Sequence, residues 1–114
     1  MERLVKFEKG DVVIFHFPFS DKDNFKKRPS LVVAVLKGDH IILAQITSAA
    51  VRSDEYAVLL ETADFQVGKL SVSSLVRPNK LFTADVSIIS SKIGTLKEDK
   101  IKEIENTLIR IFKG

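Results

Sequence analysis

Short apolar stretches separated by polar turns cover most of the chain, a pattern typical of β-strands. Three stretches are rich in the β-branched and aromatic residues that favour strands, namely 12–17, 30–36 and 40–47. The stretch 30–36 is almost continuously apolar, which indicates a central strand. Lys37-Gly38-Asp39, between the second and third stretches, has the composition of a hairpin turn. The first half of the chain therefore predicts an antiparallel meander.

The second half gives weaker strand signals. Residues 56–60 are mainly apolar, residues 70–77 alternate between apolar and polar, and residues 80–84 form another short apolar stretch. Pro78-Asn79 predicts a bend between the last two. In the first half, residues 20–27 are polar and predict a loop between the first two strands.

The C-terminal segment has a different period. Thr95-Leu96-Lys97-Glu98 matches a capping box, in which Thr95 would begin a helix. Apolar residues then recur at spacings of three, four and three, at Ile101, Ile104, Leu108 and Ile111. This spacing predicts an amphipathic helix with one apolar face that packs on the sheet or on a partner.

We find no internal repeat and predict one domain over residues 1–114. A small antiparallel sheet or partly closed barrel should cover about residues 9–90, and the helix about residues 96–112. The length of 114 residues and the 45% of hydrophobic residues suit a single globular domain with a modest core.

The amino-acid composition excludes several kinds of site. The absence of cysteine excludes a disulfide scaffold and thiolate chemistry, and two histidines argue against a zinc site, so we expect no metal or cofactor. The formal net charge of +3 permits an anionic partner without requiring one. The N-terminus lacks an apolar signal region, and the longest uncharged stretch, 40–51, is too short to span a membrane. We therefore expect a cytoplasmic protein.

Arg28 and Thr47 stand out as candidates for chemistry at strand ends. The sequence has no glycine-rich phosphate loop and no Gly-x-Ser-x-Gly motif. Arg28 stands where a basic loop meets an apolar strand, and its planar guanidinium suits phosphate; alternatively it is a surface arginine that shields a strand edge. The hydroxyl of Thr47 can donate a hydrogen bond to a phosphate oxygen, or else help to form a turn.

Several sequence blocks occur in an order that resembles the PemK/MazF toxin family. In the first half these blocks are Gly10-Asp11-Val12-Val13, Phe17-Pro18-Phe19, Arg28-Pro29-Ser30-Leu31-Val32-Val33 and Gln45-Ile46-Thr47-Ser48. The segments 70–77, 80–85 and 93–96 and the final helix follow in the same order. Each block alone is weak, but their order and spacing together are specific, and they cover residues 9–112.

This resemblance implies an SH3-like, partly open barrel with a C-terminal helix, of the PemK/MazF/CcdB type, that forms a homodimer. It also implies the endoribonuclease toxin of a type II toxin–antitoxin pair, which cleaves single-stranded RNA without metal and leaves 2′,3′-cyclic phosphate and 5′-hydroxyl ends. Catalysis in the family centres on the positions of Arg28 and Thr47. Arginine stays protonated in proteins, so Arg28 is expected to stabilise the transition-state phosphate while Thr47 hydrogen-bonds it. The general base is not assigned.

Other residues are expected to bind RNA or an antitoxin. Lysines of the first loop should attract phosphates, and two phenylalanines are stacking candidates whose alternative role is core packing. The expected substrate-binding residues are Ser48, Lys22, Lys26, Lys27, Phe19, Phe25, Arg77 and Asn79. The family's antitoxin has a commonly acidic C-terminal segment, which should fold across the same groove.

Two features depart from the family pattern. The loop before Arg28 lacks the glutamate and glycines of many members, and Asn79 stands where some relatives have an aspartate. These departures bear on the proton-transfer step and the cleavage sequence, and not on the fold. Two alternatives to the nuclease stay open: a gyrase-poisoning toxin that resembles CcdB, and an SH3-like binding domain without catalysis. The C-terminal residues 111–114 lack a Trp-Gly ending, which argues against the first alternative.

Overall fold

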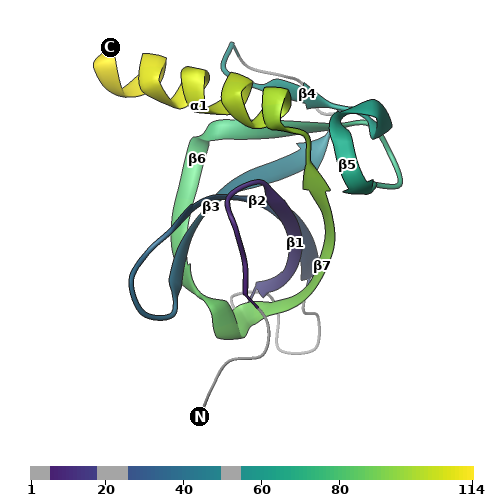
Figure 1. Cartoon of the computed structure of the whole chain (residues 1–114), viewed down its shortest axis with the longest axis vertical. Coiled ribbons are helices and arrows are strands. Elements are labelled where there is room, and N and C mark those ends of the chain that lie inside the picture. The colour runs from purple at the N-terminus through teal and green to yellow at the C-terminus, as the bar shows by residue number, and fades with distance from the viewer. Residues whose placement is uncertain (1–5, 18–25, 50–54) are drawn as a thin grey trace.

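The computed structural model describes residues 6–17, 26–49 and 55–114. In these residues seven antiparallel strands form one sheet in the order β4-β6-β3-β2-β1-β7-β5. The sheet curls around itself and the C-terminal helix α1 lies across one end of it (Figure 1). The prediction of a mainly β, partly open barrel with a C-terminal helix is thus confirmed.

The elements have the following bounds. The strands are β1 (Asp11–Phe17), β2 (Lys26–Val35), β3 (His40–Ser48), β4 (Val58–Leu60), β5 (Phe65–Gly68), β6 (Ser74–Asp85) and β7 (Ile89–Leu96). Two short 3-10 turns are η1 (Thr62–Asp64) and η2 (Val86–Ile88), and the helix is α1 (Glu98–Lys113).

The start of β2 differs from the prediction. Lys26 and Lys27 were expected in a polar loop, but they belong to β2 and pair with Phe17 and His16 of β1. Strand β1 continues to Phe17 and offers backbone partners to both lysines, so β2 begins at Lys26. The polar side chains of this segment do not interrupt the backbone hydrogen bonds between the strands.

The segment 70–77 also differs. Only its end belongs to β6, which begins at Ser74, and residues 69–73 form a bend instead of a strand. Strand β6 then continues through Pro78-Asn79, where the prediction placed a break. The register against β3 jumps there from Arg77 to Leu81, so the expected bend is a bulge inside one long strand.

Strands β5 and β7 were not predicted, and β7 changes where the helix begins. Thr95 lies in β7 and its Oγ1 donates to a carboxylate oxygen of Asp11 at 3.0 Å, so it does not cap the helix. Helix α1 begins at Glu98, two residues later than expected, and its N-cap residue Lys97 makes no side-chain capping bond. The strands accordingly extend to Leu96 and not to about residue 90.

Gly94 explains the close pairing of β5 with β7. A Cβ atom at position 94 would lie 2.6 Å from the carbonyl oxygen of Val67 and 2.9 Å from the ring of Phe65. Because real Cβ atoms do not approach so closely, glycine is required where these two strands meet.

The central strands are buried on both faces. In β1, Val12 belongs to one buried cluster and Val13 to a second. In β2, Leu31 belongs to the first cluster and Val32 to the second. Because successive side chains of a strand point to opposite faces, both faces are covered here, which explains the apolar sequence of residues 31–33. Val35 and Leu36, at the end of the apolar stretch, are 52% and 40% exposed.

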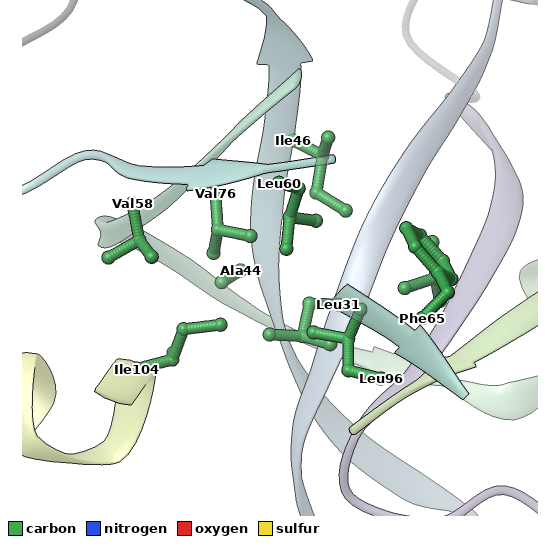
Figure 2. Packing of buried hydrophobic residues seen from close by; sticks show 10 residues of the cluster. Leu31, Ala44, Ile46, Val58, Leu60, Phe65, Val76, Leu96 and Ile104 are labelled. Carbon is green, nitrogen blue, oxygen red and sulfur yellow. The ribbon is translucent and has the colours of Figure 1, made fainter. Parts of the chain in front are cut away.

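Helix α1 covers the first of these clusters. Ile104 is 2% exposed and packs among apolar side chains of the sheet (Figure 2). Ile101 and Leu108 pack against the same cluster. The helix therefore uses its predicted apolar face to cover its own sheet. Among the described residues no helix has the length and apolar character that crossing a membrane requires.

Candidate active site

Strands β2 and β3 separate at one end. Their pairing ends at Ser30 and Gln45. Beyond this point the beginning of β2 continues along β1, and the end of β3 continues along β6. Among the described strands no pair joins residues 27–29 to residues 46–48, so the two strand ends diverge and leave space between them.

That space is a cleft of about 540 Å³. It is lined by Lys27, Arg28, Pro29, Ile46, Thr47, Ser48, Leu70, Ser71, Val72 and Ser74. Arg28 comes from β2 and Thr47 from β3, and the structure brings them together in this cleft with two of the predicted binding residues, Lys27 and Ser48. Proline at position 29 suits the point of divergence, because proline has no N–H to donate to a ladder.

The Thr47 hydroxyl has no hydrogen-bond partner among the described residues. Thr47 is partly exposed, but its Oγ1 is shielded from solvent and makes no hydrogen bond to any described residue. Rotation about χ1 moves the hydroxyl to another staggered position, and it breaks no hydrogen bond to the described part of the protein. Because Oγ1 is shielded, the hydroxyl reaches a ligand oxygen in the cleft only after such a rotation.

The electrostatic character of the cleft is basic. Lys27 and Arg28 are both exposed at the beginning of β2. None of the described residues that line the cleft carries a carboxylate. Two cations in one cleft create a potential that favours an anion such as phosphate. Within the described residues there is also no group of three potential metal ligands.

One wall of the cleft is the bend that precedes β6. The Oγ of Ser74, a residue 3% exposed, donates to the carbonyl oxygen of Val72 at 2.9 Å. The backbone N–H of Ala49 donates to the carbonyl oxygen of Ser73 at 2.9 Å, which ties the bend to the end of β3. Sequence reasoning missed this wall, because it placed residues 70–73 in a strand.

Two predicted binding residues lie outside the cleft. Arg77 pairs with Gln45 and therefore shares the sheet face of Gln45 and Thr47, but it does not line the cleft. Asn79 is exposed in the bulge of β6 and does not line it either. The remaining predicted residues, Lys22, Phe19 and Phe25, and the side chain of Lys26 lie outside the described part of the chain.

Solved structures of toxins have the same fold. The chain resembles the MazE–MazF complex of Deinococcus radiodurans (form II) with a TM-score of 0.74 and 19% identity over 93% of this chain and 95% of that one. It resembles the Mycobacterium tuberculosis toxin MazF-mt6 with a TM-score of 0.70 and 19% identity over 90% and 96%. The chain also resembles a mycobacterial endoribonuclease in complex with its cognate antitoxin, with a TM-score of 0.71 and 13% identity over 92% of this chain and 93% of that one.

The sequence comparison agrees with the fold. No curated protein sequence matches the chain significantly. A family model described as the PemK-like, MazF-like toxin of type II toxin–antitoxin systems matches residues 8–112. Because this match covers nearly the whole chain, the protein belongs to the PemK-like, MazF-like toxins, a family whose members are generally ribonucleases.

Proposed function

We propose that this toxin cleaves single-stranded RNA at the cleft between β2 and β3, without a metal ion. The observation that carries the proposal is that Arg28 and Thr47, which come from different strands, line one basic cleft. Membership of a family of ribonuclease toxins supports this reaction class.

In the proposed reaction the ribose 2′-oxygen attacks the adjacent phosphorus and the bond from phosphorus to the 5′-oxygen breaks. The products are a 2′,3′-cyclic phosphate and a 5′-hydroxyl. The 2′-hydroxyl loses one proton and the leaving 5′-oxygen gains one. The described cleft residues include no carboxylate and no imidazole, so we assign the proton acceptor to none of them.

Arg28 and Thr47 act on the phosphate oxygens. Negative charge on the non-bridging oxygens increases as the transition state forms, and the Arg28 guanidinium stabilises it. The Thr47 hydroxyl, which has no partner among the described residues, donates to the same phosphate. Donors that are held in place before the reaction lower its barrier, because they need not reorganise.

The remaining predicted residues bind the RNA around this centre. Lys27 and Ser48 line the cleft and contact the backbone there, together with Lys22 and Lys26. Phe19 and Phe25 stack on bases. Arg77 and Asn79 contact RNA beyond the cleft, since neither lines it.

An antitoxin inhibits the toxin by covering the same cleft. A basic cleft beside apolar strand ends fits an acidic, disordered segment that folds on binding. Two of the similar structures contain the toxin with its antitoxin, which supports this partner class. The active form we propose is a homodimer in the cytoplasm.

The test is RNA cleavage by an Arg28→Ala variant. The purified toxin is incubated with fluorescent single-stranded RNA of mixed sequence in the presence of EDTA. We expect cleavage by the wild type and a rate at least about a hundredfold lower for Arg28→Ala, the usual effect of removing one transition-state donor.

The matched control is Arg110→Ala, which removes an exposed arginine from the last turn of α1. This variant should cleave at the wild-type rate. If the wild type leaves varied RNAs intact, the chain is a toxin or binding domain without nuclease activity. If Arg28→Ala cleaves as fast as Arg110→Ala, the proposed site is wrong.

A further inference from the structure

A second, smaller pocket lies beside the cleft. Its volume is about 200 Å³, and it is lined by Leu60, Glu61, Thr62, Phe65, Leu70, Ser71, Val72 and Ser73. Leu70, Ser71 and Val72 line both cavities, so the bend before β6 is a shared wall. The other walls come from the end of β4, from η1 and from β5, which lie near one another in Figure 1.

The chemistry of the second pocket is opposite to that of the cleft. It contains the Glu61 carboxylate and the hydroxyls of Thr62, Ser71 and Ser73, and none of its described lining residues is basic. A carboxylate repels a phosphate but accepts hydrogen bonds from N–H groups. The second pocket therefore suits the edge of a base, whereas the cleft suits the backbone.

Glu61 is held at the mouth of this pocket by local hydrogen bonds. Its backbone N–H donates to Oδ2 of Asp64 at 2.8 Å, which fixes the residue at the start of η1. The Ser73 hydroxyl donates to Glu61 Oε2 at 3.4 Å. The Glu61 carboxylate also accepts from the backbone N–H of Asp64 in a capping box. A carboxylate can accept about four hydrogen bonds, so these two local bonds orient it and leave acceptor capacity for a ligand.

Val72 separates the two cavities. Its side chain is 58% exposed although it is apolar, and it lines both the cleft and the pocket. Because Val72 lies between the cavities, an RNA strand with its phosphate in the cleft would place a neighbouring base near it. An apolar side chain at such a position contacts the base as it turns from the stack into the pocket.

We propose that this second pocket binds a base next to the cleaved phosphate and that Glu61 selects guanine there. Guanine has two adjacent donors, N1–H and the N2 amino group, which match the two oxygens of a carboxylate. Adenine, cytosine and uracil each place an acceptor beside their donor. The pocket of about 200 Å³ has the volume of roughly six or seven water molecules at about 30 Å³ each. This is enough for one base but not for a whole nucleotide. The inference rests on the proposed RNA cleavage.

The experiment measures which bases flank the cut. A single-stranded RNA library with random sequence is cleaved by the wild type, and the new ends are sequenced. We expect guanine to be enriched at one fixed position next to the cut. The Glu61→Gln variant should lose about tenfold or more of the preference for guanine over adenine at that position, the scale of one bidentate base contact.

The matched control is Asp39→Asn, which makes the same change of charge in the β2–β3 hairpin, at the other end of these strands from the cleft. It should leave the rate and the base profile unchanged. Replacing the selected guanine by inosine, which lacks the N2 amino group, should slow the wild type and have little effect on Glu61→Gln.

Two outcomes would overturn the inference: a profile without guanine enrichment, or an enrichment that Glu61→Gln retains. A separate binding measurement distinguishes this failure from failure of the nuclease proposal. The Arg28→Ala variant should bind a short guanine-containing RNA about tenfold more tightly than its adenine-substituted form. Equal binding of both RNAs would exclude guanine selection, whatever the wild type does in a cleavage assay.

Discussion

Single residues determine the chemistry of the cleft because the sheet holds them in place. The backbone of Arg28 pairs with Phe15 of β1, and the Phe15 side chain is only 1% exposed. On the other wall the backbone of Thr47 pairs with Leu75 of β6. Functional groups on paired strands keep their geometry better than groups on loops. The backbone positions that carry the cation and the hydroxyl are therefore held in place before substrate binds.

The Thr47 hydroxyl can be tested separately from the fold. Thr47→Val keeps the shape of the side chain but removes the donor, so we expect RNA cleavage to slow by about a hundredfold. Because Oγ1 has no partner among the described residues, the free energy of unfolding should stay within about 0.5 kcal/mol of the wild type or rise.

The control at this position is Thr47→Ser, which keeps a hydroxyl and should retain most of the activity. Single-turnover cleavage and urea unfolding measure the two properties. A Thr47→Val variant that cleaves at the wild-type rate would contradict the role of the hydroxyl. A variant that loses activity and stability together would indicate a structural role instead.

At the scale of elements, α1 is bound to the sheet by a few buried side chains. Ile104 is 2% exposed within the first buried cluster, whereas Ile109 on the same helix is 53% exposed. Ile104→Ala should lower the free energy of unfolding by about 2–5 kcal/mol, because it removes buried methyl groups and leaves a cavity. Ile109→Ala should change it by less than about 0.5 kcal/mol.

Urea unfolding monitored by circular dichroism measures both variants. The helix packs on the cluster of Figure 2 and not on the cleft, so Ile104→Ala should still cleave RNA wherever it remains folded. Equal stability of the two variants would mean that α1 does not cover the core as the structure shows.

The sequence predicted elements well where local periodicity determines them. The apolar spacing of α1 and the β-branched composition of the first three strands are local signals, and the structure confirms both. Thr95 failed as a predicted cap because its hydroxyl donates to Asp11, a residue distant in sequence. The alternation in residues 70–73 is real, but those residues form the bend that precedes β6 and not a strand.

The sequence predicted only part of the site, because only part of it depends on local signals. Strand ends and residue types directed attention to Arg28 and Thr47, and the cleft contains both. The wall that Leu70 and Val72 supply depends on hydrogen bonds between distant segments, such as that from Ala49 to Ser73. Sequence patterns do not reveal such contacts, and they gave no sign of the second pocket beside Glu61.

At the scale of the whole molecule, the curled sheet positions the cleft where two central strands diverge. Strands β2 and β3 pair along most of their length, and their paired part is buried on both faces. The walls of the cleft therefore continue into the core. This arrangement places a basic cleft beside a pocket that contains a carboxylate, with one bend between them. In the proposed function one protein surface binds a phosphate and reads a neighbouring base.

The most direct test of the central claim is the chemistry of the cut made by the wild-type toxin in EDTA. We predict products with 2′,3′-cyclic phosphate and 5′-hydroxyl ends. We also predict no cleavage of the same RNA when a single 2′-deoxy nucleotide replaces the one that supplies the attacking hydroxyl. Cleavage of that 2′-deoxy substrate, or products with 5′-phosphate ends, would contradict this claim.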